Sequence, residues 1–270
     1  MNTVIQETVK GARPLQPVTD KGWRRGFANL FSKELGQWWS TRQWWVQIII
    51  WVFILNGITT IIMVEEATFT PVELLQEAVQ VFLMMGAVAT AIGIVTSTQS
   101  AIVGEKQLGT AAWIMSKPAS RAAFIWAKLL AYALGFVVTS ILVPALVFII
   151  TAGQLLTEPL PPGLFLQGLS LLVLSQLFYL TLTLMLGTLF NSRGPITGIG
   201  MAIIIGGMIL KGMLPFSVVA ITPWLLGDIG SALVFNVPLP PHWGLPIVLT
   251  AVWVVVFTAV ALWRFAREEF

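Results

Sequence analysis

The stretch from Gly104 to Arg121 reads GEKQLGTAAWIMSKPASR and interrupts a series of long apolar segments. Lys106, Lys117 and Arg121 make it basic, and its glycine, proline and serine residues are typical of a compact, turn-rich element. The apolar runs on either side are long enough to cross a lipid bilayer, whereas this stretch is too polar to lie inside one. The sequence therefore predicts membrane-spanning helices with a short folded element between two of them.

The composition of the chain is that of a membrane protein. Of its 270 residues, 57% are hydrophobic and 10% are charged, whereas soluble domains carry about 25% charged residues. The lack of cysteine excludes disulfides and thiolate metal sites, and the single histidine, His242, excludes a histidine cluster. The sequence shows no basic face interleaved with aromatic residues. We therefore expect a lipid membrane as a partner and no nucleic acid.

Six apolar segments approach or exceed the length of about 20 residues that a helix needs to cross about 30 Å of hydrocarbon. We expect an all-α membrane protein with six transmembrane helices, at about 44–64, 79–102, 122–152, 165–190, 196–214 and 246–263. The third is longer than a bilayer requires, and Pro144 predicts a kink within it. Residues 44–270 then form a single transmembrane domain, after a tail at 1–22 and an elbow helix at 23–43.

The elbow segment predicts an amphipathic helix that lies at the membrane interface. At about 100° per residue, one arc collects apolar side chains and the other collects polar and basic ones. The apolar arc comprises Trp23, Phe27, Leu30, Phe31, Leu35 and Trp38. Glu34 falls inside this arc, where it either extends to water, pairs with a neighbouring cation, or makes a functional contact.

The distribution of charge predicts the side of the membrane that each loop faces. In the six-span arrangement, 14 of the 15 lysine and arginine residues lie on one side, and Lys211 is the exception. The opposite loops carry Glu65, Glu66, Glu73, Glu77, Glu158 and Asp228. Because lysine and arginine are enriched on the cytoplasmic side, we expect both termini to be cytoplasmic. The first outer loop is then a short acidic segment at 65–78.

The third outer loop, at 215–245, is too apolar for a solvated connection, and Pro215, Pro223 and Gly227 interrupt it. We expect re-entrant or interfacial half-helices there, packed against the outer end of the bundle. Lys211 lies just before this loop and is the lone cation near membrane depth. It either extends to the outer interface or faces a cavity, where it would meet an anionic substrate or head group.

Small and polar residues follow one face of the second span. They are Gly86, Thr90, Gly93, Ser97 and Ser100. Close helix packing is the first interpretation, because small residues let helices approach and hydroxyls bond across the contact. The second interpretation is a translocation path, lined by Thr90, Ser97 and Lys211. In the fifth span, Gly194 and Gly198 form a Gly-x-x-x-Gly pattern, which indicates a possible subunit interface.

The sequence lacks the common nucleotide-binding and catalytic motifs. It contains no phosphate-binding loop, no His-Glu-x-x-His motif and no Gly-x-Ser-x-Gly motif. No carboxylate falls within the six predicted spans, although secondary transporters driven by protons or sodium commonly use one. We therefore expect that the chain is not itself an enzyme, and that any energy for transport comes from another protein.

Several residues in and around the opening stretch resemble a known family. They are Lys33-Glu34-Leu35, Arg42, Gly104-Glu105, Gly109-Thr110, Ser116-Lys117-Pro118, Ser120-Arg121 and Lys128. With six spans and both ends on one side, this chain resembles the type-2 ABC transporter permeases. It departs from many members of that family at Ala111-Ala112, where they have Leu-Glu, and Trp113 follows.

The resemblance implies a fold and a set of partners. The chain would be a multi-pass subunit in a bacterial or archaeal cytoplasmic membrane, paired with a second permease subunit as a homodimer or heterodimer. Each would dock on a separate ATP-binding cassette subunit, which binds ATP and Mg, so no cofactor is expected in this chain. The stretch after the second span would be the coupling helix. Its expected coupling residues are Gly104, Glu105, Gly109, Thr110, Trp113, Lys117, Pro118, Ser120 and Arg121.

The residues of this stretch support a docked helix independently of the resemblance. Leu108, Ala111, Ala112 and Met115 recur at helical spacing, and Pro118 would end the helix. So short a helix is unstable alone, since isolated helices need about 12–15 residues, and a partner groove would stabilise it. An ordinary interfacial loop is the alternative.

Two classes of function remain open. The first is the membrane subunit of an ATP-driven exporter, with a small amphiphilic or hydrophobic molecule as the favoured cargo. The second is a non-transporting membrane scaffold or sensor that recruits a cytoplasmic ATPase. An intramembrane enzyme is a distant third, because the sequence indicates no nucleophile and base pair.

Overall fold

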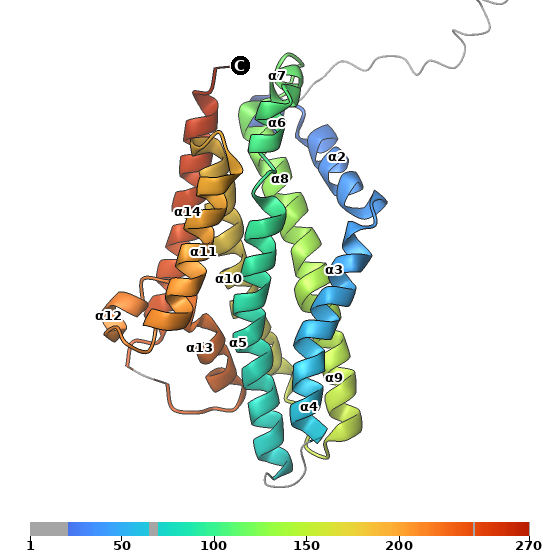
Figure 1. The fold of residues 1–270 in the computed structure, drawn as a ribbon, viewed down its shortest axis with the longest axis vertical. Helices are drawn as coiled ribbons and strands as arrows, with labels where there is room; N and C mark the ends of the chain where they lie inside the picture. The colour runs from blue at the N-terminus through green and yellow to red at the C-terminus, as the bar shows by residue number, and fades with distance from the viewer. Residues whose placement is uncertain (1–20, 65–69, 240, 270) are drawn as a thin grey trace, which may run out of the picture.

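The computed structural model describes residues 21–64, 70–239 and 241–269, so most of the expected tail lies outside it. Within these residues the chain is an elongated bundle of helices without strands (Figure 1). Six of its described helices are long and apolar enough to cross a membrane: Gln43–Val64, Pro71–Gln107, Arg121–Leu155, Pro162–Leu189, Arg193–Leu210 and Gly244–Ala266. The prediction of an all-helical protein with six spans is confirmed.

Helix α5 (Pro71–Thr98) begins well before the predicted start of the second span at about 79. Thr70 and Glu73 form a capping box, in which the Thr70 backbone N–H donates to Glu73 Oε2 at 2.8 Å. Pro71, at the first helical position, needs no hydrogen-bond acceptor there. The acidic loop expected at 65–78 is therefore shorter than predicted, since 71–78 is helical, and its residues 65–69 lie outside the described chain.

The first and third spans each contain a wide, π-helical turn. The first consists of α3 (Gln43–Trp51), the turn η2 (Val52–Asn56) and α4 (Gly57–Val64). The third consists of α8 (Arg121–Phe136), the turn η3 (Val137–Leu142) and α9 (Val143–Leu155). The second wide turn ends two residues before Pro144, whose ring would clash with the carbonyl four residues earlier in a regular helix. Where the sequence predicts a kink, the structure thus has a widened turn, and the span continues through it.

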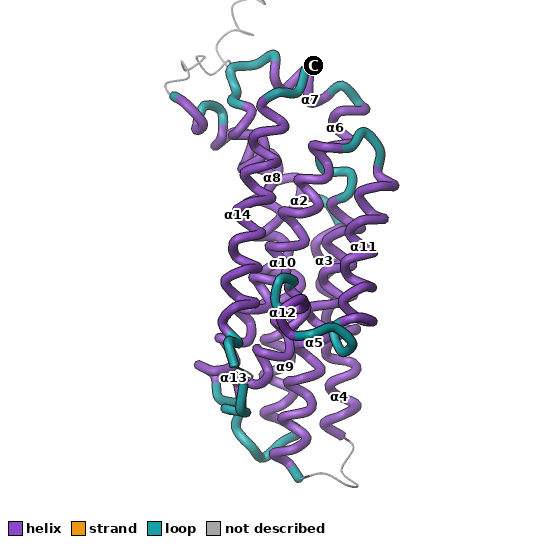
Figure 2. The backbone as a smooth tube through the Cα atoms, turned by 90° about the vertical axis from the view of Figure 1, so that its left-hand side faces the viewer, coloured by secondary structure: helices purple, strands orange, loops and turns teal. Residues whose placement is uncertain are grey.

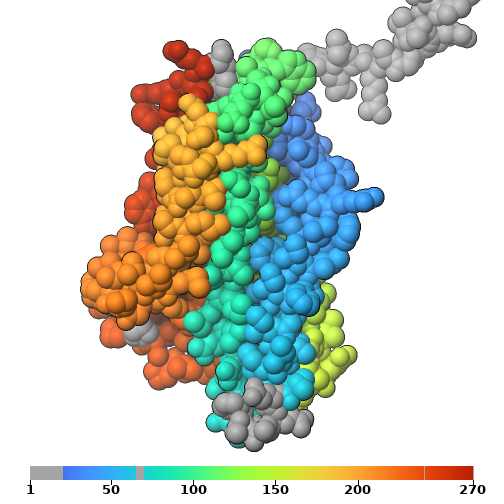
Figure 3. Space-filling view, in the orientation of Figure 1, coloured from blue at the N-terminus to red at the C-terminus, as the bar shows by residue number. Residues whose placement is uncertain are grey.

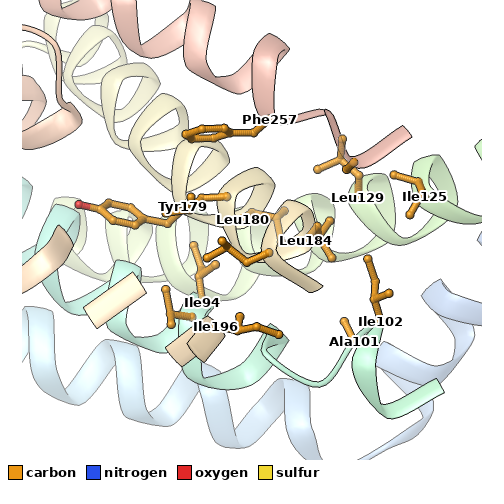
Figure 4. Packing of buried hydrophobic residues seen from close by; sticks show 14 of the residues in the cluster. Ile94, Ala101, Ile102, Ile125, Leu129, Tyr179, Leu180, Leu184, Ile196 and Phe257 are labelled. Atoms are coloured by element: carbon orange, nitrogen blue, oxygen red, sulfur yellow. The ribbon is translucent and has the colours of Figure 1, made fainter. Parts of the chain in front are cut away.

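Helix α10 (Pro162–Leu189) contributes to a core that it shares with α5, α8, α11 (Arg193–Leu210), and α14 (Gly244–Ala266). Figure 4 shows this packing from close by: Phe257 of α14 lies on one side of α10, and Ile94 of α5 and Ile196 of α11 lie on the other. A second apolar cluster includes Phe82, Phe148 and Phe165 on α5, α9 and α10. The long apolar segments are thus held together by packing of large side chains along the bundle.

The apolar connection after α11 folds into short helices. They are α12 (Phe216–Val219), the 3-10 turn η4 (Pro223–Leu225) and α13 (Leu226–Val234). Helix α13 lies against α5 and α10 (Figures 1 and 2). A Cβ atom on Gly227 would approach the α5 backbone to 3.1 Å, at Leu83 O, and one on Gly230 would lie 3.4 Å from Gly168 Cα on α10. Glycine therefore lets this short helix sit close to both long ones.

One end of the bundle carries both ends of the described chain, and we call it the terminal end. It holds η1 (Gly22–Arg24), α2 (Phe27–Ser40), α6 (Val103–Gln107), α7 (Thr110–Met115) and the end of α14 (Figure 1). The elbow helix was predicted from Trp23, but it begins at Phe27, because Gly26 has a left-handed φ of 77° that interrupts the helix. Part of its apolar arc packs on α8, where the Trp38 ring lies against Gly135.

Candidate functional site

The predicted coupling stretch forms two short helices at the terminal end. Helix α6 continues the direction of the second span, and Gly109 separates it from α7. Gly109 has a φ of 69°, and no atom lies within 4 Å of where its Cβ would be. The glycine is therefore required by backbone conformation and not by lack of space.

Helix α7 presents an apolar surface to the outside. The Leu108 and Trp113 side chains are 79% and 62% exposed, and the Lys117 ammonium lies 3.4 Å from the centre of the Trp113 ring. Ala111 and Ile114 are buried on the opposite face. The structure differs from the predicted apolar face in that Leu108 precedes the helix and is exposed, because Gly109 turns the chain between Leu108 and Ala111.

Glu105 does not face outward but belongs to a partly buried ionic network. Its Oε1 lies 3.1 Å from Lys33 Nζ of α2 and 2.9 Å from Lys128 Nζ of α8. Glu34 Oε1 lies 3.1 Å from the same two lysines. The Lys128 side chain is 2% exposed and that of Glu34 is 5% exposed. Of the interpretations of Glu34, the structure bears out pairing with a cation, and it extends the pair to four residues on three helices.

This network changes the proton affinity of Lys33, which lies outside the membrane-spanning segments. Partial burial alone would lower the pKa of Lys33, but the carboxylates of Glu34 and Glu105 outweigh it and hold the pKa above the ordinary value of 10.5. Lys33 is therefore a stable cation on the surface of the network, with Lys128 beneath it.

A second group of contacts ties α6 to the far side of the bundle. The Lys106 ammonium lies 2.9 Å from Glu268 Oε1 and donates to the backbone carbonyl of Thr188 at 3.1 Å. Gln107 donates from Nε2 to the carbonyl of Asn191 at 2.8 Å. Helix α6 is thus fastened to α2 and α8 on one side, and to the end of α10 and the chain after α14 on the other.

The end of the stretch is fixed to both ends of the described chain. Ser120 caps α8 by accepting from Ala123 N at 2.9 Å, and its hydroxyl donates to the Trp23 carbonyl at 2.7 Å. Arg121 donates to the Ala266 carbonyl. Of the nine predicted coupling residues, the structure turns Glu105, Ser120 and Arg121 toward the bundle and buries Gly104. It leaves Gly109, Thr110, Trp113, Lys117 and Pro118 exposed.

A cavity of about 460 Å³ lies at mid-length of the bundle, between α5, α10, α11 and α13. Its wall includes Lys211, whose Nζ lies 2.7 Å from Oδ2 and 3.1 Å from Oδ1 of Asp228. The predicted alternatives for Lys211 were an outward extension or a cavity. The structure places it in a cavity wall but already paired with an acid.

Asp228 was not predicted as the partner of Lys211, because its segment was assigned to an outer loop. The folding of residues 226–234 into α13 brings this carboxylate back beside α11. The signal that could have found the pair was a lone cation near membrane depth followed, 17 residues later, by a lone acid in an apolar segment.

Thr90 and Ser97, the other two residues predicted to line a translocation path, do not line this cavity. Thr90 is buried and donates to the Gly86 carbonyl of its own helix, and Ser97 is half-buried. Within the same stripe, a Cβ atom on Gly86 would lie 3.0 Å from Leu172, and one on Gly93 would overlap the ring of Trp51. These contacts favour helix packing for the stripe. Gly194 and Gly198 of α11 face open space.

The described part of the chain contains no group of three or more histidine, cysteine or acidic side chains that could hold a metal ion.

Among known proteins, the profile of a family described as a protein of unknown function (DUF2705) matches residues 45–270. A comparison with curated proteins finds no match. The match begins within the first span and covers the other five spans, both short helices of the coupling stretch, and the residues that line the cavity.

Proposed function

The chain belongs to the DUF2705 family of proteins of unknown function, and we propose that it is the membrane-spanning permease subunit of an ATP-driven exporter. In this proposal its terminal end faces the cytoplasm of a bacterial or archaeal cell. A separate ATP-binding cassette subunit docks there and supplies ATP and Mg, and a second permease subunit completes the assembly.

The observation that carries the proposal is the contrast between the two faces of α7. Leu108 and Trp113 are exposed beyond the end of the bundle, next to the cation of Lys117. Aromatic side chains are enriched at protein interfaces, where tryptophan is a frequent hot spot. Since α7 has only six residues, a partner's groove would stabilise a helix that is too short to persist alone.

The contacts that hold α6 in place support a role in transmitting force. The helix is joined by ion pairs or hydrogen bonds to α2, α8, the end of α10 and the chain after α14. The second span reaches continuously from Pro71 to Gln107, and the third begins at Arg121. A displacement of α7 by a closing ATPase would therefore be carried into two spans at once, because packed elements move as rigid bodies.

The positive charge at the terminal end supports its cytoplasmic placement. Lys33 and Lys106 lie on α2 and α6 at this end, and Lys117 follows α7. Lys128 contacts Glu34 and Glu105 there, and Arg193 approaches Gly104. Enrichment of lysine and arginine on the cytoplasmic side is the strongest general signal of membrane topology. The proposed second permease subunit is supported more weakly, by the open face of Gly194 and Gly198 on α11.

The proposal is tested with the full chain and each cassette ATPase of the same organism in turn. The two are co-expressed, purified together in lipid bilayers, and assayed for retention of the complex and for ATPase stimulation. We expect the double change Leu108→Ser and Trp113→Ala to weaken the complex about 30-fold, as for loss of one interface hot spot. Trp45→Ala, which removes an exposed tryptophan of α3, is the matched control.

Two outcomes would decide against this function. If the double variant retains the ATPase and its stimulation as well as Trp45→Ala does, α7 is not the docking element. If the complex forms through α7 but no lipid, peptide or ion ever changes its ATPase rate or moves across the membrane, the scaffold or sensor function replaces the exporter.

A further inference from the structure

The cavity at mid-length of the bundle has the size and lining of a ligand site. Its volume of about 460 Å³ lies within the range of roughly 300–1,000 Å³ that is usual for small-molecule pockets. Most of its wall is apolar and comes from five elements. Large lining side chains include Met84, Met85, Ile92, Tyr179, Met208 and Trp224. Methionine is flexible and polarizable, and it suits a wall that adapts to apolar chains of different shape.

The cavity wall carries one ion pair in this apolar surface. Among the described residues that line it, Lys211 and Asp228 are the charged ones. Their side chains are 30% and 34% exposed, so each can still accept a further partner. Asp228 also lies in the first turn of α13, where the helix dipole favours a carboxylate.

The cavity is accessible from the side of the bundle that contacts lipid. Ile92 and Met208, which line it, are 38% and 60% exposed, and Ile205 beside them on α11 is 52% exposed. In Figure 3 the surface of α5 is visible beside that of α11. An exposed apolar surface at this depth of a membrane protein lies against acyl chains, so a ligand can enter from the bilayer.

We propose that this cavity binds a lipid-like amphiphile with a zwitterionic head, such as one carrying a phosphate and an ammonium. The apolar tail lies along Met84, Met208 and Trp224, and the head meets the Lys211–Asp228 pair. The phosphate oxygens accept from Lys211, and the ammonium donates to Asp228. The ligand class follows from the charges and the lining, and its identity as cargo rests on the proposed function.

The charge of the pair selects the head group. A purely anionic head that binds Lys211 would lie close to the carboxylate of Asp228, which repels it. A purely cationic head that binds Asp228 would be repelled by Lys211 in the same way. A head with both signs is favoured, because it adds a partner to each residue of the pair without placing like charges side by side.

Binding is measured with the purified full chain in bilayers of sugar-headed lipids, without any ATPase. The probes are brominated amphiphiles of one tail length with zwitterionic, anionic or cationic heads, which quench tryptophan fluorescence on contact. We expect the zwitterionic probe to bind about tenfold more tightly than the other two. The quenching should fall in Trp224→Phe, since that ring lines the cavity.

Charge variants test the pairing directly. Asp228→Asn should shift the preference about tenfold toward the anionic probe, and Lys211→Gln should shift it as far toward the cationic one. The exchange Lys211→Asp with Asp228→Lys should restore the zwitterionic preference. A role in folding alone would not invert selectivity in this way, so melting temperatures measured in parallel separate the two.

A variant that fills the cavity tests whether the amphiphile binds there. Ala87→Phe, which places a ring in the cavity wall, should reduce binding of the zwitterionic probe about tenfold, whereas Ala202→Phe on the exposed face of α11 should not. Equal binding of all three heads, or charge variants without a change of preference, would overturn the proposal. Since no ATPase is present, this result is independent of whether the chain is a permease.

Discussion

Lys128 Nζ lies 3.1 Å from Glu34 Oε1, although 94 residues separate the two in the sequence. The pair joins α8 to α2, and both side chains are almost completely buried. Glu105 meets the same lysine from α6, so one ammonium holds together the elbow helix, the third span and the base of the coupling stretch. The position of α7 therefore depends on a charge cluster beneath it.

Removal of the central cation is expected to destabilise the terminal end. Lys128→Met leaves two carboxylates that share Lys33 alone, and breaking a buried pair costs about 3–5 kcal/mol. Glu34→Gln should cost less, because Lys128 keeps Glu105 as a partner. We expect a coupling energy of about 1–3 kcal/mol between the two sites in a double-mutant cycle, measured by unfolding in detergent. Lys21→Met, at an exposed position before α2, is the control, and additive effects would contradict the network.

The glycines of the spans should differ sharply in their tolerance of alanine. A methyl group on Gly93 would overlap the indole ring of Trp51, so Gly93→Ala should destabilise the protein by about 1–3 kcal/mol. Gly198 has no neighbour within 4 Å, and Gly198→Ala should be neutral or stabilise by up to about 1 kcal/mol through helix propensity. Melting temperatures of the two variants, measured with the chain as a monomer in detergent, check this, and a loss of stability in monomeric Gly198→Ala would contradict it. In an assembled dimer the same change would weaken the contact that is proposed for the second subunit.

The two motif glycines of the coupling stretch should also differ. Gly109→Ala forces a Cβ into a left-handed conformation and should cost about 1–2 kcal/mol, whereas Gly109→Asn should cost less. Gly104 is helical and its nearest neighbour would lie 3.6 Å from a new Cβ, so Gly104→Ala should be tolerated. The rate of protease cleavage within 108–115 reports the change at the tip. Faster cleavage in Gly104→Ala than in Gly109→Ala would refute this assignment.

The pKa of Lys33 predicts a stability change at high pH. Its pKa is raised above 10.5 in the folded protein, so its contribution is fully present below pH 10.5 and is lost as the pH rises through the folded-state value. The difference in melting temperature between the wild type and Lys33→Met should therefore be constant at neutral pH and shrink above about pH 10.5. A difference that grows in that range would show that the carboxylates do not hold this cation.

Much of the fold could be predicted because a bilayer imposes length and polarity on each segment. Six apolar runs had to become helices, since backbone groups in hydrocarbon must bond within their own segment. The start of α5 was misplaced because Glu73 and Glu77 seemed to mark a loop. Because they follow Thr70 and Pro71, these two residues instead lie in the first turns of a helix, which begins before the predicted span.

The candidate sites were harder to predict, because they depend on contacts between distant segments. Spacing alone could not show that Glu105 faces inward while Trp113 faces outward, since the turn at Gly109 decides it. Nor could it show that Asp228 returns to Lys211, because that pairing requires α13 to fold back against α5 and α10.

The sequence by itself determined the class of the protein, the number of spans and the basic stretch between two of them, since these follow from local hydropathy and charge. The tertiary structure alone decided which charges are paired and which residues remain exposed. Lys128 with Glu34, and Lys211 with Asp228, are brought together by helix packing. Packing is a property of the whole bundle, because each contact depends on how close two backbones can approach.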